Sequence, residues 1–387
     1  MSVTTSKKVL FVTTSRPTEG SGTGERSLGI LRAIARVAEP YVLVLDHREH
    51  APLPADTADT TTVPLYHGAA QSTWFWRRRK YTLGDYRVDP LLLDTVRRLD
   101  QHHRFDAYFC RYFTSTVAGC DRLGPALLDF DDVPHVMPGP RLPGWRPLGW
   151  RVTAQRLRTF RTVLVTKQAD RLRLPHPDVR VLPCISTRLP QADPLPGSQP
   201  GAEGAPRLLF VGSVRWGPNR DGLQRFIERS LPAVRRAVPG LVLRAVGEDT
   251  DRLPPAPGLT GAGYVDDIAA EYAAADVVIV PIQAGDGANI KLAEAARFGK
   301  AIVASGHAAR GFAGILEPGL DLLAGESDAE LAALCVRLLN NRPERDALGR
   351  HAQVAAERDL SQQAIDRIVG GALTDTWLRA PASARTA

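Results

Sequence analysis

Short apolar runs alternate with amphipathic stretches along the first half of the chain. Apolar residues in 25–37 recur at the spacing of a helix, whereas the runs on either side have the continuous apolar character of buried strands. The runs that we interpret as strands cover 8–13, 41–45, 106–110, 127–129 and 163–166. Strands that alternate with helices predict a parallel, doubly wound sheet of the α/β class.

This pattern stops in residues 186–206 and then begins again. The segment is rich in proline, glycine and alanine and shows no periodicity, which is typical of a linker. The second series of predicted strands and helices covers 208–211, 219–238, 242–246, 267–274, 277–282, 328–340 and 361–378. A second doubly wound sheet is therefore expected after the linker.

The two series predict two Rossmann-like domains. The first domain covers 1–185, the linker 186–206 and the second domain 207–360, and we expect the C-terminal helix in 361–387 to pack back toward the first domain. Ligands of open α/β sheets collect at the carboxyl ends of the strands. Two such sheets facing each other across a cleft can hold a donor on one side and an acceptor on the other.

Composition and charge restrict the class of protein. With 387 residues, 44% of them hydrophobic and 24% charged, the chain has the composition of an ordinary globular protein. Its net charge of +7 permits an anionic ligand or a membrane surface, but the arginines are scattered and form no nucleic-acid-binding module, so we expect no nucleic acid. No apolar stretch approaches the roughly 20 residues of a membrane helix.

The cysteines indicate the compartment. The four cysteines lie far apart and lack CxxC spacing, which argues against a zinc site and against a disulfide framework. A reducing environment suits them. We therefore expect a cytoplasmic protein, soluble or peripheral at the inner face of the membrane.

The segment 275–305 contains the strongest candidate site. A buried strand leads through a glycine-bearing loop into a short helix and a second buried strand, with Asp286 and Glu294 eight positions apart and Lys291 between them. A helix that begins near Gly287 directs backbone N–H groups toward an anion in the loop. One interpretation is a nucleotide site in which Lys291 neutralises a diphosphate. The other is a capped surface helix with a solvated lysine.

The loop in 211–221 is a second candidate. It joins a predicted strand to a predicted helix and carries Arg215 and Trp216. A guanidinium group presents fixed donors to phosphate oxygens, so Arg215 could stabilise a phosphate leaving group. Alternatively, Arg215 is a surface arginine, and Pro218 merely begins the helix.

The first domain offers weaker signals. Gly22 and Gly24 follow the first strand, but their spacing is not that of the dinucleotide-binding fingerprint. Two interpretations of this turn remain, contact with the acceptor and a flexible turn without a ligand. Asp129, Asp131 and Asp132 lie at the end of another strand, where carboxylates could bind a metal, act as a base or cap a loop. Because the sequence offers no second ligand cluster, we predict no metal.

Two tryptophan-rich basic patches also lie in the first domain. One is WFWRRRK at 74–80, and the other combines tryptophan and arginine within 145–151. Tryptophan beside cations suits a membrane interface or a lipid-linked anionic substrate. Partly buried aromatic residues with solvated arginines are the alternative.

Taken together, these motifs resemble the retaining GT-B glycosyltransferases of family 4, also called glycosyl transferases group 1. The resemblance is clear over 208–340, in LLFVGSV, in LTGAGYVDDIAAEYAAADVVIVPI, and in Asp286-GANIKLA-Glu294 followed by Gly299 and AIVAS. In the first domain it rests on VLFVTT, the glycine-bearing turn, VLVTKQAD and VRVLPCIS.

The chain departs from the family pattern at several positions. Asp286 stands where the family has the first of two glutamates, and Ser213 stands where an arginine is usual. The familiar lysine and glycine of the following helix are replaced around Pro218, and the glycine pair after the third strand reads Gly247-Glu248-Asp249. We expect the nearest cations on the same two loops, Arg215 and Lys291, to take over the phosphate.

The resemblance implies a retaining glycosyltransferase with a GT-B fold, which moves a sugar from a nucleoside-diphosphate sugar to a hydroxyl acceptor. It implies no metal and no cofactor besides the donor co-substrate. The implied catalytic residues are Arg215, Lys291 and Asp286, the donor-binding residues Gly212, Gly287, Ala288, Asn289, Ile290 and Glu294, and the acceptor-side residues Gly22, Gly24, Arg111 and Asp131. Asp286 would orient the sugar and Glu294 the ribose.

Other functions use the same paired domains. A sugar-nucleotide epimerase, a phosphorylase and a non-catalytic nucleotide-sugar binding protein all remain alternatives at this point. The donor base is open among UDP, GDP and dTDP, and the acceptor among a glycan, a lipid-linked glycan and a specialised metabolite.

Overall fold

The computed structural model of the chain describes residues 6–18, 22–44, 61–64, 90–112, 120, 123–131, 133, 154–185, 205–285 and 289–379. The chain divides into two compact units. The N-terminal unit comprises Met1–Pro183 and Gln362–Ala387, and the C-terminal unit comprises Cys184–Ser361. The two tryptophan-rich patches, Asp132, and the loop residues Asp286, Gly287 and Ala288 lie outside the described residues.

The N-terminal unit is built on a parallel sheet. Its described strands are β1 (Lys8–Thr13), β2 (Glu39–Val44), β3 (Thr61–Pro64), β4 (Ala107–Arg111), β5 (Ala126–Asp129), β6 (Thr162–Val165) and β7 (Val179–Val181), in the spatial order β3-β2-β1-β4-β5-β6-β7. The helices are α1 (Gly22–Ala35), α3 (Pro90–His103), α5 (Gln168–Arg173) and α13 (Gln362–Leu378). The strand order reverses direction between β1 and β4.

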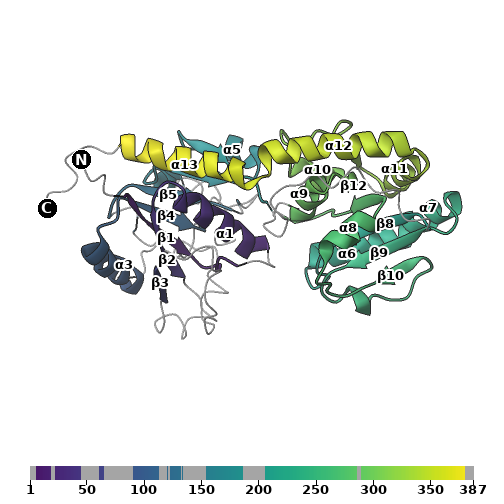
Figure 1. Ribbon diagram of the computed structural model, residues 1–387, viewed down its shortest axis with the longest axis horizontal. Coiled ribbons are helices and arrows are strands. Elements are labelled where there is room, and N and C mark those ends of the chain that lie inside the picture. Colours follow the sequence, from purple (N-terminus) through teal and green to yellow (C-terminus); the bar gives the residue numbers. More distant parts are fainter. Residues whose placement is uncertain are drawn as a thin grey trace, which may run out of the picture. The chain divides into compact units, whose positions relative to one another are not determined.

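The C-terminal helix α13 completes the N-terminal unit. Figure 1 shows α13 alongside α1, and it also contacts β4 and β5. Its buried face is made of small and branched apolar side chains such as Ala364, Ile365 and Val369. A Cβ at Gly370 would lie 3.4 Å from Val37 Cγ1. The small residues of α13 therefore let it pack closely, although some 180 residues separate it from β7 along the chain.

The C-terminal unit contains a second parallel sheet. Its described strands are β8 (Arg207–Val211), β9 (Val242–Val246), β10 (Leu259–Gly261), β11 (Val277–Val280), β12 (Ala301–Ser305) and β13 (Leu323–Gly325), in the order β10-β9-β8-β11-β12-β13. The helical segments are α6 (Gly217–Arg225), η5 (Phe226–Ser230), α7 (Leu231–Ala237), η6 (Thr250–Arg252), α8 (Ile268–Ala274), α9 (Ile290–Arg297), α10 (Gly306–Arg310), α11 (Asp328–Asn340) and α12 (Arg342–Asp359). Two doubly wound parallel sheets confirm the predicted fold class.

Several helices differ from the sequence-based prediction, which also lacked α3, α5 and α10. The helix α1 begins at Gly22 rather than at residue 25, so that Gly22 and Gly24 belong to its first turn. The helix expected at 219–238 contains the π-helical turn η5, because Pro232 has no N–H with which to continue the α-helical ladder. The helix α12 was not predicted, because its buried positions are mostly alanine and glycine and give only a weak apolar stripe.

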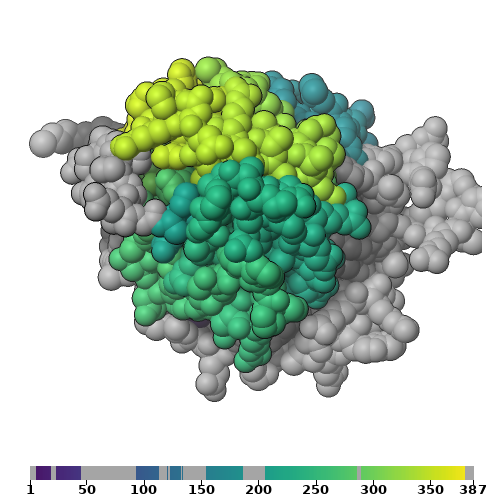
Figure 2. Space-filling view, turned by 90° about the vertical axis from the view of Figure 1, so that its right-hand side faces the viewer, coloured from purple at the N-terminus to yellow at the C-terminus, as the bar shows by residue number. Residues whose placement is uncertain are grey.

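The helices of the C-terminal unit also pack on one another. The yellow-green segment of α11 and α12 lies beside the teal segment that includes η5 and α7 in Figure 2, and α11 contacts η5, α7 and α12. The helix α12 packs on α9 and β12, and a Cβ at its Gly349 would come within 2.2 Å of the Gly299 carbonyl oxygen. In the described part of the chain, no helix is both long enough and apolar enough to span a bilayer.

Candidate functional site

The candidate site of the C-terminal unit lies where its strand order reverses. The strands β8 and β11 are neighbours in the sheet but not in the sequence, so the loops at their carboxyl ends diverge to opposite sides. Such a switch point is where open α/β sheets bind ligands. The β8–α6 loop carries Gly212 and Arg215, and the β11–α9 loop leads into Lys291.

Lys291 is a buried lysine in the first turn of α9. Its side chain is only 6% exposed, and its Nζ donates a hydrogen bond to Asn219 Oδ1 at 3.0 Å. The Asn219 side chain in turn donates from Nδ2 to the Ser213 carbonyl oxygen at 2.9 Å. Burial lowers the pKa of Lys291 to about 8, although the Glu294 carboxylate acts in the opposite direction. A neutral amide thus partners a charge that burial disfavours.

Two glycines allow the backbone to approach this lysine. A Cβ at Gly212 would lie 2.9 Å from Asn219 Nδ2 and 3.3 Å from Lys291 Cε. A Cβ at Gly247 would lie 2.4 Å from the Gly212 carbonyl oxygen, and Gly247 has a φ of +133°, which side chains rarely allow. The structure therefore brings Gly212 and Lys291 together, and a side chain at either glycine would push the loops apart.

Glu294 lies one helical turn after Lys291, on the same face of α9. Its carboxylate is largely buried, and Oε2 accepts a hydrogen bond from the Tyr272 hydroxyl at 3.0 Å. Asn289 is the N-cap residue of α9, although its side chain makes no capping hydrogen bond, and Ile290 is the first helical residue. The helix N-terminus supplies a partial positive charge beside the lysine.

Arg215 is held by two carboxylates. Its guanidinium group forms ion pairs with Glu248 at 2.7 Å and with Asp249 at 2.6 Å, both in the segment that follows β9. The arginine side chain is 59% exposed, so these pairs face solvent. Asp249 adopts a left-handed backbone conformation with a φ of +63°. Arg215 therefore ties the β8–α6 loop to the β9 loop and is not buried with Lys291.

Sequence reasoning missed two residues of this site. Asn219 looks like a helix-start residue in GPNRD, and Tyr272 looks like one more apolar position of α8. Only the folded chain places Asn219 against Lys291 and Tyr272 against Glu294. The one signal in the sequence is a polar group at a position that the helical period assigns to the buried face, because a buried polar group needs a hydrogen-bond partner.

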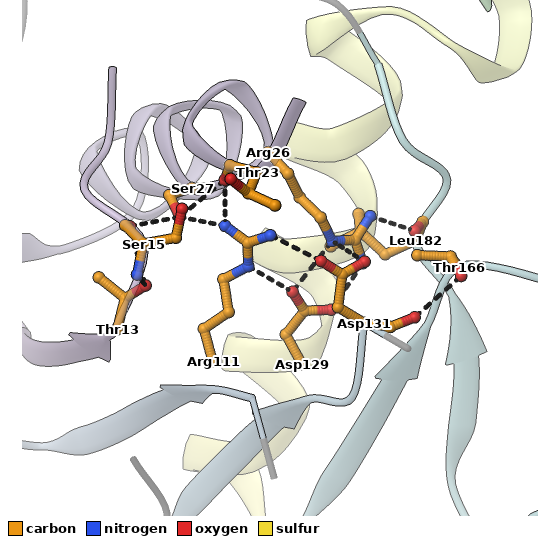
Figure 3. A network of polar contacts seen from close by, with 10 residues as sticks. All are labelled: Thr13, Ser15, Thr23, Arg26, Ser27, Arg111, Asp129, Asp131, Thr166 and Leu182. Carbon is orange, nitrogen blue, oxygen red and sulfur yellow. Dashed lines mark hydrogen bonds and ion pairs between the residues drawn. The ribbon is translucent and has the colours of Figure 1, made fainter. Parts of the chain in front are cut away.

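The carboxyl edge of the N-terminal sheet contains a different kind of cluster, drawn in Figure 3. Arg26 of α1 binds Asp129 through two hydrogen bonds of 3.0 and 2.6 Å and also faces Asp131 at 3.4 Å. Arg111, at the end of β4, pairs with Asp129 at 3.2 Å and with Asp131 at 2.7 Å. Two buried cations thus balance two buried carboxylates.

This charge network also fixes the start of α1. Arg111 donates hydrogen bonds to the Thr23 carbonyl oxygen and to the Ser27 hydroxyl, and Arg26 donates to the Leu182 carbonyl oxygen at 2.7 Å. These contacts outweigh the low helix propensity of Gly22 and Gly24, which accounts for the early start of the helix.

The network bears on the acceptor-side residues predicted from the sequence. Arg111 is fully buried, and its guanidinium group faces Asp129 and Asp131. Burial by itself would raise the pKa of Asp131, but the guanidinium groups of Arg26 and Arg111 outweigh it and hold that pKa below its ordinary value. Asp131 is therefore an ionised hydrogen-bond acceptor.

No cluster of three histidine, cysteine or acidic side chains suited to a metal ion occurs within the described ranges. Around the start of α9 the described side chains are instead Lys291, Glu294, the Asn219 amide and the Tyr272 hydroxyl group. Their chemistry suits an anion bound next to a group with hydroxyls.

The comparisons with known proteins identify the C-terminal part of the chain. Residues 205–341 match the family model described as Glycosyl transferases group 1. These residues form a glycosyltransferase domain of group 1, family 4. Both loops of the candidate site lie inside the matched range. Among curated protein sequences, none matches this glycosyltransferase at a significant level.

Solved structures match the whole glycosyltransferase. The sucrose-phosphate synthase of Thermosynechococcus elongatus aligns with a TM-score of 0.69 at 16% identity, covering 97% of this chain and 100% of that one. HepE of Anabaena in complex with UDP-glucose aligns with a TM-score of 0.62 at 15% identity, covering 95% and 99%. WaaG, a glycosyltransferase involved in lipopolysaccharide biosynthesis, aligns with a TM-score of 0.55 at 16% identity, covering 94% of this chain and 100% of that one. The chain has the GT-B fold.

We predict that the charge network stabilises the N-terminal unit of this glycosyltransferase strongly. Replacing Arg26 by Met leaves the buried Asp129 and Asp131 with one guanidinium group fewer, and should lower the free energy of unfolding by about 3–5 kcal/mol. Arg98→Met is the matched control, because Arg98 pairs with Asp94 on an exposed helix face and should cost less than about 1 kcal/mol. Urea titration of the full chain measures both, and equal losses would contradict this prediction.

We also predict that Lys291 destabilises the fold. Between pH 8 and 10.5 the unfolded chain binds a proton at residue 291 that the folded chain does not, so the lysine's cost is greatest below pH 8 and disappears as the pH rises. Lys291→Met should raise the free energy of unfolding at pH 7 by on the order of 3 kcal/mol. The gain should vanish near pH 10.5, whereas the exposed control Lys7→Met should show no such gain at any pH. A Lys291→Met protein less stable than the wild type at pH 7 would contradict the assignment.

Proposed function

We propose that this glycosyltransferase moves a sugar from a nucleoside-diphosphate sugar to a hydroxyl group with retention of configuration at the sugar carbon. The observation that carries the proposal is the buried Lys291 ammonium at the switch point of the C-terminal sheet, where Asn219 provides a neutral partner. Burial outweighs the attraction of the Glu294 carboxylate, so an anion at this site would stabilise the charged form of the lysine further. HepE, which shares the fold, has been solved with UDP-glucose bound.

Lys291 is the proposed cation for the donor diphosphate. A lysine that is desolvated before the ligand arrives interacts more strongly with a phosphate than a hydrated one, because less water must be displaced. Gly212 places the loop backbone next to Lys291 without an intervening side chain. The N-terminus of α9 adds N–H groups and a partial positive charge.

The remaining donor contacts come from both ends of the β11–α9 segment. Glu294 is assigned to the ribose, because a largely buried carboxylate accepts hydrogen bonds from hydroxyl groups. Asn289 and Ile290 contribute the start of α9, whereas Asp286, Gly287 and Ala288 are assigned to the donor from the sequence motif alone. Asp286 would orient the sugar that is transferred.

In the proposed reaction, the bond between the sugar carbon and the diphosphate oxygen breaks while the acceptor oxygen bonds to the same face of that carbon. The proton of the acceptor hydroxyl passes to the departing diphosphate. Lys291, Arg215 and the N-terminus of α9 stabilise the negative charge that develops on the leaving group. In this scheme the protein supplies the positive charge from its own side chains and backbone.

Arg215 can assist only after it changes partners. Its two ion pairs are exposed, and exposed pairs hold their partners only weakly because solvent screens the charges. A diphosphate carries more charge than either carboxylate and accepts the guanidinium fork in a bidentate manner. We propose that Arg215 leaves Glu248 and Asp249 when the donor binds.

The acceptor is assigned to the carboxyl edge of the N-terminal sheet. Asp131 is the member of the charge network that can accept a hydrogen bond from an acceptor hydroxyl, and Arg26 and Arg111 orient it. Gly22 and Gly24 lie in the first turn of α1 beside this network. The acceptor itself is a glycan, a lipid-linked glycan or a specialised metabolite, and peripheral membrane contact fits the second of these.

A ligand screen tests the donor assignment. UDP-, GDP- and dTDP-sugars should be compared by thermal shift, because a ligand of the folded state raises the midpoint by mass action. One of them should stabilise the wild-type protein, and none should stabilise Lys291→Met. Binding should weaken by about tenfold per pH unit above pH 8, because the free protein then holds Lys291 neutral. Affinity that is unchanged in Lys291→Met would remove Lys291 from the donor site.

The proposed exchange of Arg215 gives a second test. Asp249→Asn keeps a residue type that tolerates the left-handed conformation but removes one competing charge. It should therefore tighten donor binding by about two- to fivefold, whereas Arg215→Ala should weaken binding or turnover. If Asp249→Asn lowers the affinity for the donor as much as Arg215→Ala does, the arginine serves only to tie the two loops together. Isothermal calorimetry distinguishes these results.

A further inference from the structure

A groove of about 350 Å³ lies at the amino edge of the C-terminal sheet. Two of its residues, Arg235 and Arg236, belong to the last turn of α7, which leads to the start of β9. Two others, Ala256 and Pro257, lie just before the start of β10. The proposed donor site follows the carboxyl ends of β8 and β11, so the groove lies at the opposite edge of the same sheet.

The two arginines of this groove carry charge without an acidic partner. Within the part of the chain that the structure describes, neither the Arg235 nor the Arg236 side chain forms an ion pair or a hydrogen bond, and none of the residues that line the groove is acidic. Most other arginines of this unit are paired, as Arg225 is with Asp328 at 2.7 Å. Two neighbouring positive charges are therefore left without compensation here.

Arg235 is fitted into the wall of the groove. A Cβ at Gly258 would lie 2.4 Å from Arg235 Nε and 2.6 Å from Cδ, so only a glycine leaves room for this side chain. Its Nε is buried and has no hydrogen-bond partner. An arginine near a helix end can donate to the last carbonyl oxygens of the helix, but Arg235 makes no such bond among the described residues. Because its guanidinium group has lost water without gaining a partner, an anion in the groove is attracted more strongly than by a hydrated arginine.

The rest of the groove is apolar. Its remaining lining residues are Ile227, Leu231, Pro232, Ala256 and Pro257. The two prolines have no backbone N–H that would need a partner. Covering this surface with an apolar group is favourable, whereas a small hydrated anion gains nothing from it. The volume of the groove lies within the range of small-molecule sites, so it suits a ligand with an anionic end and an apolar body.

We propose that this groove binds the phosphate monoester of an apolar alcohol, with the phosphate against Arg235 and Arg236 and the alkyl group on the apolar wall. A phosphate monoester carries about 1.5 to 2 negative charges at pH 7, which matches two guanidinium groups, whereas a carboxylate carries one. The same chemistry occurs in a free alkyl phosphate and in a membrane phospholipid with a terminal phosphate headgroup. The proposal is independent of the proposed sugar transfer, because no residue of the donor site takes part in it.

Calorimetry on the full chain tests the site. Octyl phosphate, kept below the concentration at which it forms micelles, is compared with inorganic phosphate and with octanoate. The wild-type protein should bind octyl phosphate about tenfold or more tightly than either, because only octyl phosphate uses both the charged and the apolar wall. Arg235→Met and Arg236→Met should each weaken the binding of octyl phosphate by about tenfold or more, because each removes a hydrogen bond between charged groups.

Matched variants separate this site from general charge effects and from the donor site. Arg350→Met removes an exposed arginine of the same unit that does not line the groove, and it should bind octyl phosphate as the wild type does. Lys291→Met should also retain this binding. Ala256→Leu narrows the groove, so it should weaken octyl phosphate and leave inorganic phosphate within about twofold. Thermal midpoints without ligand report whether each variant is folded.

Flotation with phosphatidylcholine vesicles that contain phosphatidic acid distinguishes the two sources of the phosphate. Flotation of the wild type that is lost in Arg235→Met identifies a membrane headgroup, whereas binding of octyl phosphate without flotation identifies a free ligand. The proposal is overturned if the wild type binds octyl phosphate no better than inorganic phosphate, or if both arginine variants retain full binding. If Lys291→Met alone loses octyl phosphate, the phosphate binds at the start of α9 and the groove is not its site.

Discussion

A buried ammonium with a neutral partner is the interaction on which the C-terminal site depends. Lys291 could have been left in solvent or paired with a described carboxylate, and either arrangement would have been less costly. Instead the chain places it against Asn219, and two glycines allow the loops to close around it. The fold thus stores electrostatic free energy that an anionic ligand can release, in the way that functional sites commonly use perturbed pKa values.

The N-terminal edge shows the opposite use of charge. Arg26, Arg111, Asp129 and Asp131 form a balanced set of two cations and two anions, so that none of them calls for an anionic ligand. The network holds the ends of β4 and β5 and the first turn of α1 in register. Within this network, Arg26 and Arg111 keep the Asp131 carboxylate ionised and fix its orientation. The two sheets share one architecture, but their edges differ because the buried cations are ion-paired in one, whereas in the other the buried lysine donates its hydrogen bond to a neutral amide.

The arrangement of the two loops also limits Arg215. Being long and exposed, it reaches the carboxylates that follow β9 without burying any charge. An arginine in such a position is easily exchanged between partners, whereas Lys291 cannot leave its site without unpacking α9. The two cations that the sequence offered as equivalent substitutes therefore have unequal roles, one fixed and one movable.

The sequence by itself determined the two doubly wound sheets, the approximate bounds of most strands and the segment in which Lys291 and Glu294 lie. Strand and helix patterns are local, whereas the strand order that creates the switch point comes from the tertiary structure. Only the tertiary structure decided which polar atoms meet: Asn219 with Lys291, Tyr272 with Glu294, Arg26 with Asp129, and α13 with α1. These partners are 22 to about 100 residues apart or, for the two helices, more than 300, so no local pattern encodes them. Their pairing results from the packing of helices on the sheets. A buried polar group must find its hydrogen-bond partner among the neighbours that this packing supplies.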